Sequence, residues 1–109
     1  MGISKLESFS ENQNRLAALA KAMGHPARIA ILEVLIKHKT CLCADIVSAL
    51  PLAQATISQH LKELKDAGII HAVEEHPKVF YHIDEAACSQ VVALLGSLFK
   101  KMYQSSVRA

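Results

Sequence analysis

Residues 50–70, LPLAQATISQHLKELKDAGII, restrict the possible fold of this chain more than any other stretch. Ile57, Leu61 and Leu64 are spaced i, i+4 and i+7, so a helix here would place them in one apolar stripe. A proline before this helix marks its start, and Gly68 marks its end because glycine readily adopts the left-handed, positive-φ conformation that stops a helix. The opposite face has small polar side chains first and lysines later: Gln54, Thr56, Ser58, Gln59, Lys62 and Lys65.

A helix with this polar face has the chemistry to read DNA. The amides of Gln54 and Gln59 each offer a donor and an acceptor, which is the pattern that recognises an adenine edge in the major groove. The hydroxyls of Thr56 and Ser58 can contact bases or phosphates. An ordinary solvated surface helix has similar residues, so the face alone leaves both interpretations open.

The composition fits one small domain with a core. The chain has 109 residues, 51% of them hydrophobic, and a net charge of +2, which permits nucleic-acid contact without arguing for it. It lacks an apolar run of about 18 residues and a signal-peptide core, so we expect no membrane span and a cytoplasmic location. Three cysteines, an odd number, argue against a disulfide framework.

The remaining periodicity predicts helices and a hairpin around this stretch. We expect helices over residues 12–23, 26–39, 40–50 and 84–103, and a β-hairpin over residues 70–83 with its turn at 75–78. Ile29, Leu32, Leu35 and Ile36 are expected to form the core stripe of the second of these helices. This order is that of a helix-turn-helix followed by a wing. The predicted fold is mainly α with a small β-hairpin, a dimeric winged helix-turn-helix of order α-α-α-α-β-β-α. The predicted organisation is a flexible segment 1–11, a DNA-binding and dimerisation domain 12–104 and a flexible tail 105–109.

The last predicted helix has more apolar surface than one core can use. Val91, Leu94, Leu95 and Leu98 suit one stripe, but further apolar residues such as Val92 lie outside it. A small monomer rarely leaves such a surface in water. We therefore expect this helix, together with the first helix, to form a homodimer interface.

Three segments resemble the ArsR/SmtB family of dimeric winged-helix repressors, and together they span most of residues 16–99. They are MGHPARIAILEVL, CLCADIVSALPLAQATISQHLKELKDAGII and VFYHIDE. The resemblance implies a repressor that binds a palindromic double-stranded DNA operator as a homodimer through its first and last helices. Many members of the family release DNA when they sense a metal, a metalloid or an oxidant.

The resemblance also assigns roles to residues. The family's groove-reading positions correspond to Gln54, Thr56, Ser58, Gln59 and His60, although His60 could instead pack at the edge of the core. Ala53 stands where the family usually has a capping serine, a loss worth about 1 kcal/mol of helix initiation. We expect phosphate contacts from lysines within and outside this helix: Lys37, Lys39, Lys62, Lys65 and Lys78.

Cys41 and Cys43 lie where arsenic-responsive members have a cysteine pair at the start of the third helix. Thiolates bind soft metals and metalloids, so As(III) or Sb(III) are possible inducers, with no cofactor required. A helix N-terminus would lower the thiol pKa. Residues i and i+2 of a helix point about 200° apart, so shared binding requires Cys41 to lie outside the first turn. The family's third thiol is replaced by Ile46, which leaves simple packing, metalloid sensing and thiol oxidation as three open interpretations.

Other sites of the family are incomplete in this sequence. The zinc site requires a histidine where this chain has Ala86, although Asp84 is present, and the cadmium arm requires a cysteine before Cys41. The alternatives are a protein-interaction module with a degenerate winged helix, or an ArsR-like regulator that senses no metal. We do not expect an enzyme, because no nucleophile and base lie beside a glycine-rich or oxyanion-forming loop.

Overall fold

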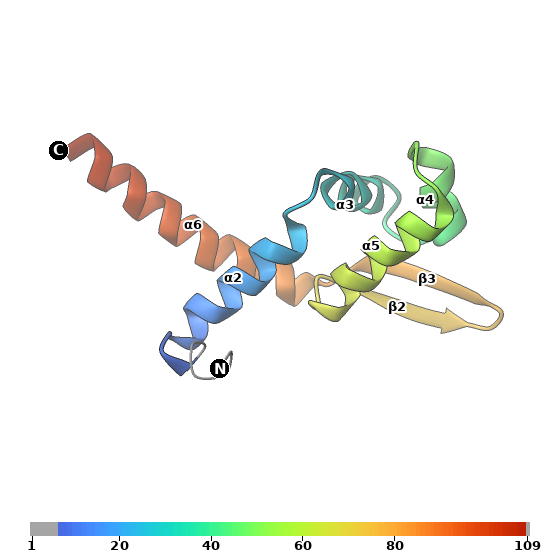
Figure 1. The fold of residues 1–109 in the computed structure, drawn as a ribbon, viewed down its shortest axis with the longest axis horizontal. Coiled ribbons are helices and arrows are strands. Elements are labelled where there is room, and N and C mark those ends of the chain that lie inside the picture. The colour runs from blue at the N-terminus through green and yellow to red at the C-terminus, as the bar shows by residue number, and fades with distance from the viewer. Residues whose placement is uncertain (1–6, 109) are drawn as a thin grey trace.

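The structure, a computed structural model, describes residues 7–108, so residues 1–6 of the predicted flexible segment lie outside the described residues. Figure 1 shows α2 beside α6 at one end of the molecule and the β2–β3 hairpin projecting at the other. The elements are α2 (Glu11–Met23), α3 (Pro26–His38), β1 (Cys41–Leu42), α4 (Cys43–Ala49), α5 (Gln54–Asp66), β2 (Ile70–Glu75), β3 (Lys78–Ile83) and α6 (Glu85–Arg108).

Local side-chain chemistry sets where α2 and α6 begin. The hydroxyl of Ser10 accepts a hydrogen bond from the backbone N–H of Gln13 at 3.0 Å, and the Gln13 side chain accepts one from the Ser10 N–H. At the start of α6, a carboxylate oxygen of Asp84 accepts from the backbone N–H of Ala87 at 2.8 Å. Each contact satisfies an amide that the helix leaves without an internal partner.

The sheet has three antiparallel strands in the order β1-β3-β2, one more than the predicted hairpin. Cys41 pairs with Tyr81 across β1 and β3, and the hairpin register runs from Ile70–Ile83 to Glu75–Lys78. The predicted start of the third helix at residue 40 is therefore wrong, since α4 begins at residue 43. The two preceding residues are extended because they can pair with the exposed edge of β3.

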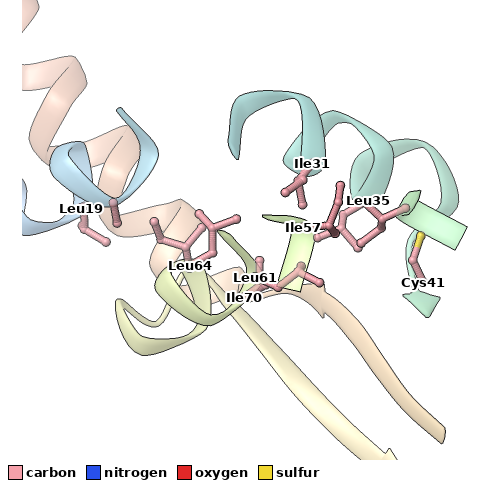
Figure 2. Packing of buried hydrophobic residues seen from close by; sticks show 11 residues of the cluster. Leu19, Ile31, Leu35, Cys41, Ile57, Leu61, Leu64 and Ile70 are labelled. Atoms are coloured by element: carbon pink, nitrogen blue, oxygen red, sulfur yellow. The ribbon is translucent and has the colours of Figure 1, made fainter. Parts of the chain in front are cut away.

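The buried core joins every element of the helix-turn-helix to the base of the wing. Figure 2 shows side chains of α3 and α5 meeting above Ile70 of β2, with Leu19 of α2 at one end and Cys41 at the other. The stripe predicted for α5 is confirmed, because all three of its members are buried. The largest fully buried apolar side chains are Leu19, Ile31, Leu35, Ile46, Ile57, Leu61, Leu64 and Ile70.

Two helices differ from their predicted form. In α3, Ile29 and Ile36 were expected in the core but are exposed, because the helix is apolar nearly all round and a single chain covers only one side of it. The last helix, predicted to end at Tyr103, continues to Arg108 and so includes most of the residues predicted as a tail. Its final turns lie beyond the rest of the molecule in Figure 1.

A strained turn connects α3 to β1. Lys39 has φ 67° and ψ −49°, and the N–H of Thr40 donates to the carbonyl oxygen of His38 at 2.7 Å. This is a γ-turn of the rare hand, which disfavours residues that have a Cβ atom. Such a conformation costs on the order of 1–3 kcal/mol, so the surrounding contacts must hold it in place.

We expect Lys39→Gly to raise the free energy of unfolding by about 0.5–1 kcal/mol. Glycine removes the backbone strain of the folded state, and this gain exceeds the cost of the greater conformational entropy that glycine gives the unfolded chain. Urea denaturation followed by circular dichroism measures this change. Lys37→Gly is the matched control, since it places the same residue inside α3 and should lower stability by about 1 kcal/mol. Equal losses in both variants would show that the turn is not strained.

Candidate nucleic-acid interface

The outward face of α5 is the candidate DNA-reading surface. Gln54, Thr56, Ser58 and Gln59 are all exposed and lie outside the buried stripe of the helix. Ala53, at the N-cap, provides no side-chain cap, as the sequence predicted. The first amides of α5 therefore have no side-chain acceptor from the cap, which leaves them available to an anion such as a phosphate.

The second half of this face already has partners on the same helix. Gln59 donates through Nε2 to a carboxylate oxygen of Glu63 at 3.2 Å. Lys62 Nζ lies 2.9 Å from a carboxylate oxygen of Asp66, and this hydrogen bond raises the pKa of Lys62. These side chains are exposed, so solvent screens both interactions and a nucleic acid could replace them at little cost.

The other lysines proposed for phosphate contact lie on different elements. Lys78 opens β3 at the tip of the hairpin, Lys37 is in the last turn of α3, Lys39 forms the γ-turn before β1, and Lys65 is in the last turn of α5. All four are exposed. They are therefore accessible to a polyanion, although they are spread over different parts of the molecule.

His60 differs from its neighbours on α5 because it is half-buried. Its Nδ1 accepts a hydrogen bond from Nε of Arg28 at 3.1 Å, and its ring centroid is 4.6 Å from that of His25. Nothing in the spacing of residues near Arg28 indicates such a role. No local pattern could have found this contact, because the partners are separated by 32 residues and meet only when α3 packs on α5.

The three cysteines have different surroundings. Cys41 is only 1% exposed, within β1, whereas Cys43 is half-buried as the first residue of α4 and Cys88 is exposed on α6. Burial, and then the nearby charge of Asp45, raise the pKa of Cys41. The lowered pKa expected at a helix N-terminus is therefore wrong for Cys41, since this residue precedes the helix and is shielded from water.

Cys43 contacts the candidate DNA-reading helix directly. Its sulfur lies 3.6 Å from the hydroxyl oxygen of Ser58 on α5. A change at this thiol would therefore act on a residue of the polar face. Both residues were predicted from the sequence as functional, but the contact between them was not.

The two cysteines lie on different elements and do not form a prebuilt metal site. Cys41 lies in a strand and Cys43 in a helix, so the objection to two thiols two positions apart on one helix does not apply. Within the part of the chain that the structure describes, no cluster of three or more His, Cys, Asp or Glu side chains is placed to hold a metal ion. A cavity of about 390 Å³ is lined by His38, Thr40, Cys41, Asp45 and Ser48, so it adjoins Cys41.

Comparison with known proteins places this geometry in a family. Residues 25–72, from the start of α3 into β2, match the pattern of the family described as bacterial regulatory protein, arsR family. An uncharacterised HTH-type transcriptional regulator of Methanocaldococcus jannaschii is 34% identical over 88 residues, which cover 81% of this chain and 99% of that relative. The chain belongs to the ArsR family.

Two further relatives have solved structures. The transcriptional repressor PagR of Bacillus anthracis is 30% identical over a region that covers 75% of this chain and 82% of PagR. The crystal structure of PagR superposes with a TM-score of 0.65 over 76% of this chain and 94% of the PagR chain. The transcriptional activator HlyU of Vibrio cholerae is 29% identical over 86% of each chain, and its structure gives a TM-score of 0.68 over 87% and 98%.

Membership of the ArsR family confirms the predicted winged helix-turn-helix fold and a role as a DNA-binding transcription regulator. The relatives compared here are transcription regulators rather than enzymes. Among residues 7–108, no helix has the length and apolarity needed to cross a membrane.

Proposed function

We propose that this protein is a homodimeric repressor that binds a palindromic operator through α5. The observation that supports this most strongly is the exposed row of small hydrogen-bonding side chains on a helix whose other side is fixed in the core. Gln54, Thr56, Ser58 and Gln59 would contact base edges and nearby phosphates. His60 would lie at the inner edge of that surface, and Lys39, Lys62, Lys65 and Lys78 would contact phosphates.

The apolar outer face of α6 supports the dimer. Val92, Phe99 and Tyr103 are 74%, 56% and 68% exposed, and their spacing places them in one stripe. The inward residues of α6, such as Ala87 and Val91, lie on a different side of the helix. A single chain therefore leaves the outer stripe in water, whereas a second copy would cover it and set two α5 helices about 34 Å apart.

Fluorescence anisotropy with the DNA upstream of the gene tests the main proposal, with random DNA of equal length as the control. We expect tighter binding to the upstream DNA, and an affinity that falls steeply with salt because several lysines displace counterions from phosphates. Equal affinity for the two DNAs would count against a specific operator at that locus.

We also propose that a thiol-directed inducer acts at Cys41 and Cys43 and releases the DNA. The support is the contact between Cys43 and Ser58, which joins the thiol to the polar face of α5. Hydrated As(III) or Sb(III) would form a bond to the sulfur with release of water, and a polysulfide would oxidise the thiolate by transferring one sulfur atom to it and leaving as a shorter polysulfide. Either product is larger than the thiol and would displace Ser58. Arsenite, antimonite and polysulfide should release DNA from the wild type but not from Cys43→Ser; an unchanged response in that variant contradicts a role for this thiol.

Alkylation by iodoacetamide should separate the two thiols. We expect Cys41 to react on the order of ten-fold or more slowly than Cys43, because Cys41 is buried and its raised pKa leaves less thiolate at neutral pH. Mass spectrometry of the time course measures both rates, and the protein in urea provides the control, in which the rates should converge. Equal rates in the folded protein would contradict this assignment.

A further inference from the structure

Arg28, His25 and His60, three side chains that can carry a positive charge, lie together where α5 packs against α3. Arg28 of α3 donates through Nε to Nδ1 of His60 at 3.1 Å and through one terminal nitrogen to the carbonyl oxygen of Ala22 at 3.0 Å. Ala22 belongs to the last turn of α2, so a single guanidinium connects α2, α3 and the candidate DNA-reading helix. No other function described above uses this link.

The direction of this hydrogen bond determines which nitrogen of the His60 imidazole carries the proton. Arginine stays protonated in proteins and can only donate, so Nδ1 of His60 must present a lone pair. The ring is therefore neutral and its single proton is on Nε2. In this form His60 offers one N–H donor beyond the Arg28 contact, and its orientation is held by α3.

The surroundings of His60 oppose a second proton. Burial, and then the charges of His25 and Arg28, lower the pKa of His60, while Glu63 of α5 acts in the opposite direction. Lys21 of α2 and Asp66 of α5 line the adjoining cavity of about 530 Å³, together with His25, Arg28 and Glu63. Protonated His60 would present an N–H to an arginine that cannot accept it.

We propose that Arg28 is a positioning residue that holds neutral His60 in its Nε2–H form and thereby fixes α5 for DNA binding, and that protonation of His60 breaks the link and weakens binding. The second part rests on the proposed role of α5 at the operator. The first concerns the free protein and can be tested without DNA.

The sign of the pH effect follows from the two states of the ring. In an unfolded or loosened chain His60 takes up a proton near the ordinary value of about 6.5, whereas the folded site resists it. The contribution of this site to stability is therefore complete above that value and is lost as the pH falls through the lower pKa of the folded state. Acidification should release α5 from α3, not tighten it.

Nitrogen-15 NMR of the histidine rings tests the link in the free protein. We expect the His60 signal to show the Nε2–H form at neutral pH and to titrate below its ordinary pKa. In Arg28→Met the pKa should rise, because the hydrogen bond to the neutral ring and a neighbouring positive charge are both lost. Arg28→Lys keeps the charge without the fixed Nε donor and should lose the preference for one tautomer.

Two findings would overturn the positioning role. One is a proton on Nδ1 of His60 in the wild type, and the other is a His60 titration midpoint and tautomer that are unchanged from the wild type in both Arg28 variants. His60→Gln assigns the signal by removing it. Proton spectra of each variant establish that it is folded, and if Arg28→Met is not, Arg28→Lys alone decides the question.

Anisotropy with one fixed duplex then tests the consequence for binding. Between about pH 8 and about pH 5.5, at constant ionic strength, the wild type should lose roughly five-fold in affinity relative to His60→Asn. The asparagine oxygen can accept from Arg28 but does not titrate in this range. His38→Asn, at the exposed end of α3, controls for the other histidines and should retain the wild-type profile.

A wild-type profile that matches His60→Asn would refute the protonation switch. The α5 substitutions discussed below separate this failure from failure of the proposed function. If DNA affinity is insensitive to changes on the outer face of α5 while the NMR result holds, the operator assignment is wrong and the Arg28–His60 link stands.

Discussion

Replacing Phe99 with glutamate should make the protein monomeric and weaken operator binding by about 100-fold or more. Phe99 lies at the centre of the exposed stripe that also contains Val92 and Tyr103. A carboxylate there would have to be buried without a partner when two copies meet, which is strongly unfavourable. A monomer presents one α5 helix instead of two linked ones, so it loses the gain in effective concentration that a paired site provides.

Sedimentation equilibrium and anisotropy measure the two effects of Phe99→Glu. Gln104→Glu is the matched control, because it adds the same charge to an exposed polar position of α6. It should remain dimeric and bind normally. A Phe99→Glu protein that is still dimeric would place the subunit contact elsewhere, and a monomer with full affinity would mean that pairing is not needed for binding.

The double substitution Gln54→Ala and Gln59→Ala should lower affinity for the operator by about 100-fold, while binding to random DNA changes little. Each glutamine can form a bidentate contact worth about 1–3 kcal/mol of base discrimination, and both side chains are exposed on α5. The substitutions leave the lysines that we propose as phosphate contacts unchanged, so the salt dependence should be retained. Specificity should therefore fall much more than general DNA affinity.

Competition between labelled operator and random duplex measures this loss. Gln104→Ala is the control for removing an exposed glutamine amide from a different helix, and should bind like the wild type. The helix itself should persist, because alanine is the best helix former and neither glutamine packs in the core. An unchanged specificity ratio would mean that α5 does not read bases through these amides.

The sequence predicted the features that depend on nearby residues. The buried stripe of α5, its lack of a capping side chain and the positive φ of Gly68 after it are all confirmed. The hairpin predicted over residues 70–83 is also present, although Glu75 and Lys78, expected in its turn, pair with each other at the ends of the two strands. These features span no more than one helix or one hairpin, so local periodicity and turn chemistry are sufficient to specify them.

The features that the sequence missed depend on packing between distant segments. The pairing of Cys41 with Tyr81, which buries the thiol and reverses the expected direction of its pKa, requires β1 to reach the edge of β3. The exposed faces of Ile29 and Ile36 could not be predicted because an apolar helix does not indicate which side its neighbours will cover. The strain at Lys39 likewise arises from joining α3 to that strand.

The sequence by itself therefore determined the helices and the hairpin, their order, the polar face of α5 and the surplus of apolar surface on α6. The tertiary structure decided which side chains meet: Cys43 with Ser58, and Arg28 with His60. Periodicity encodes the inside and outside of an element because each residue's direction depends only on its position along that element. A contact between residues 15 or 32 positions apart depends instead on how two helices are docked, which the whole core sets together.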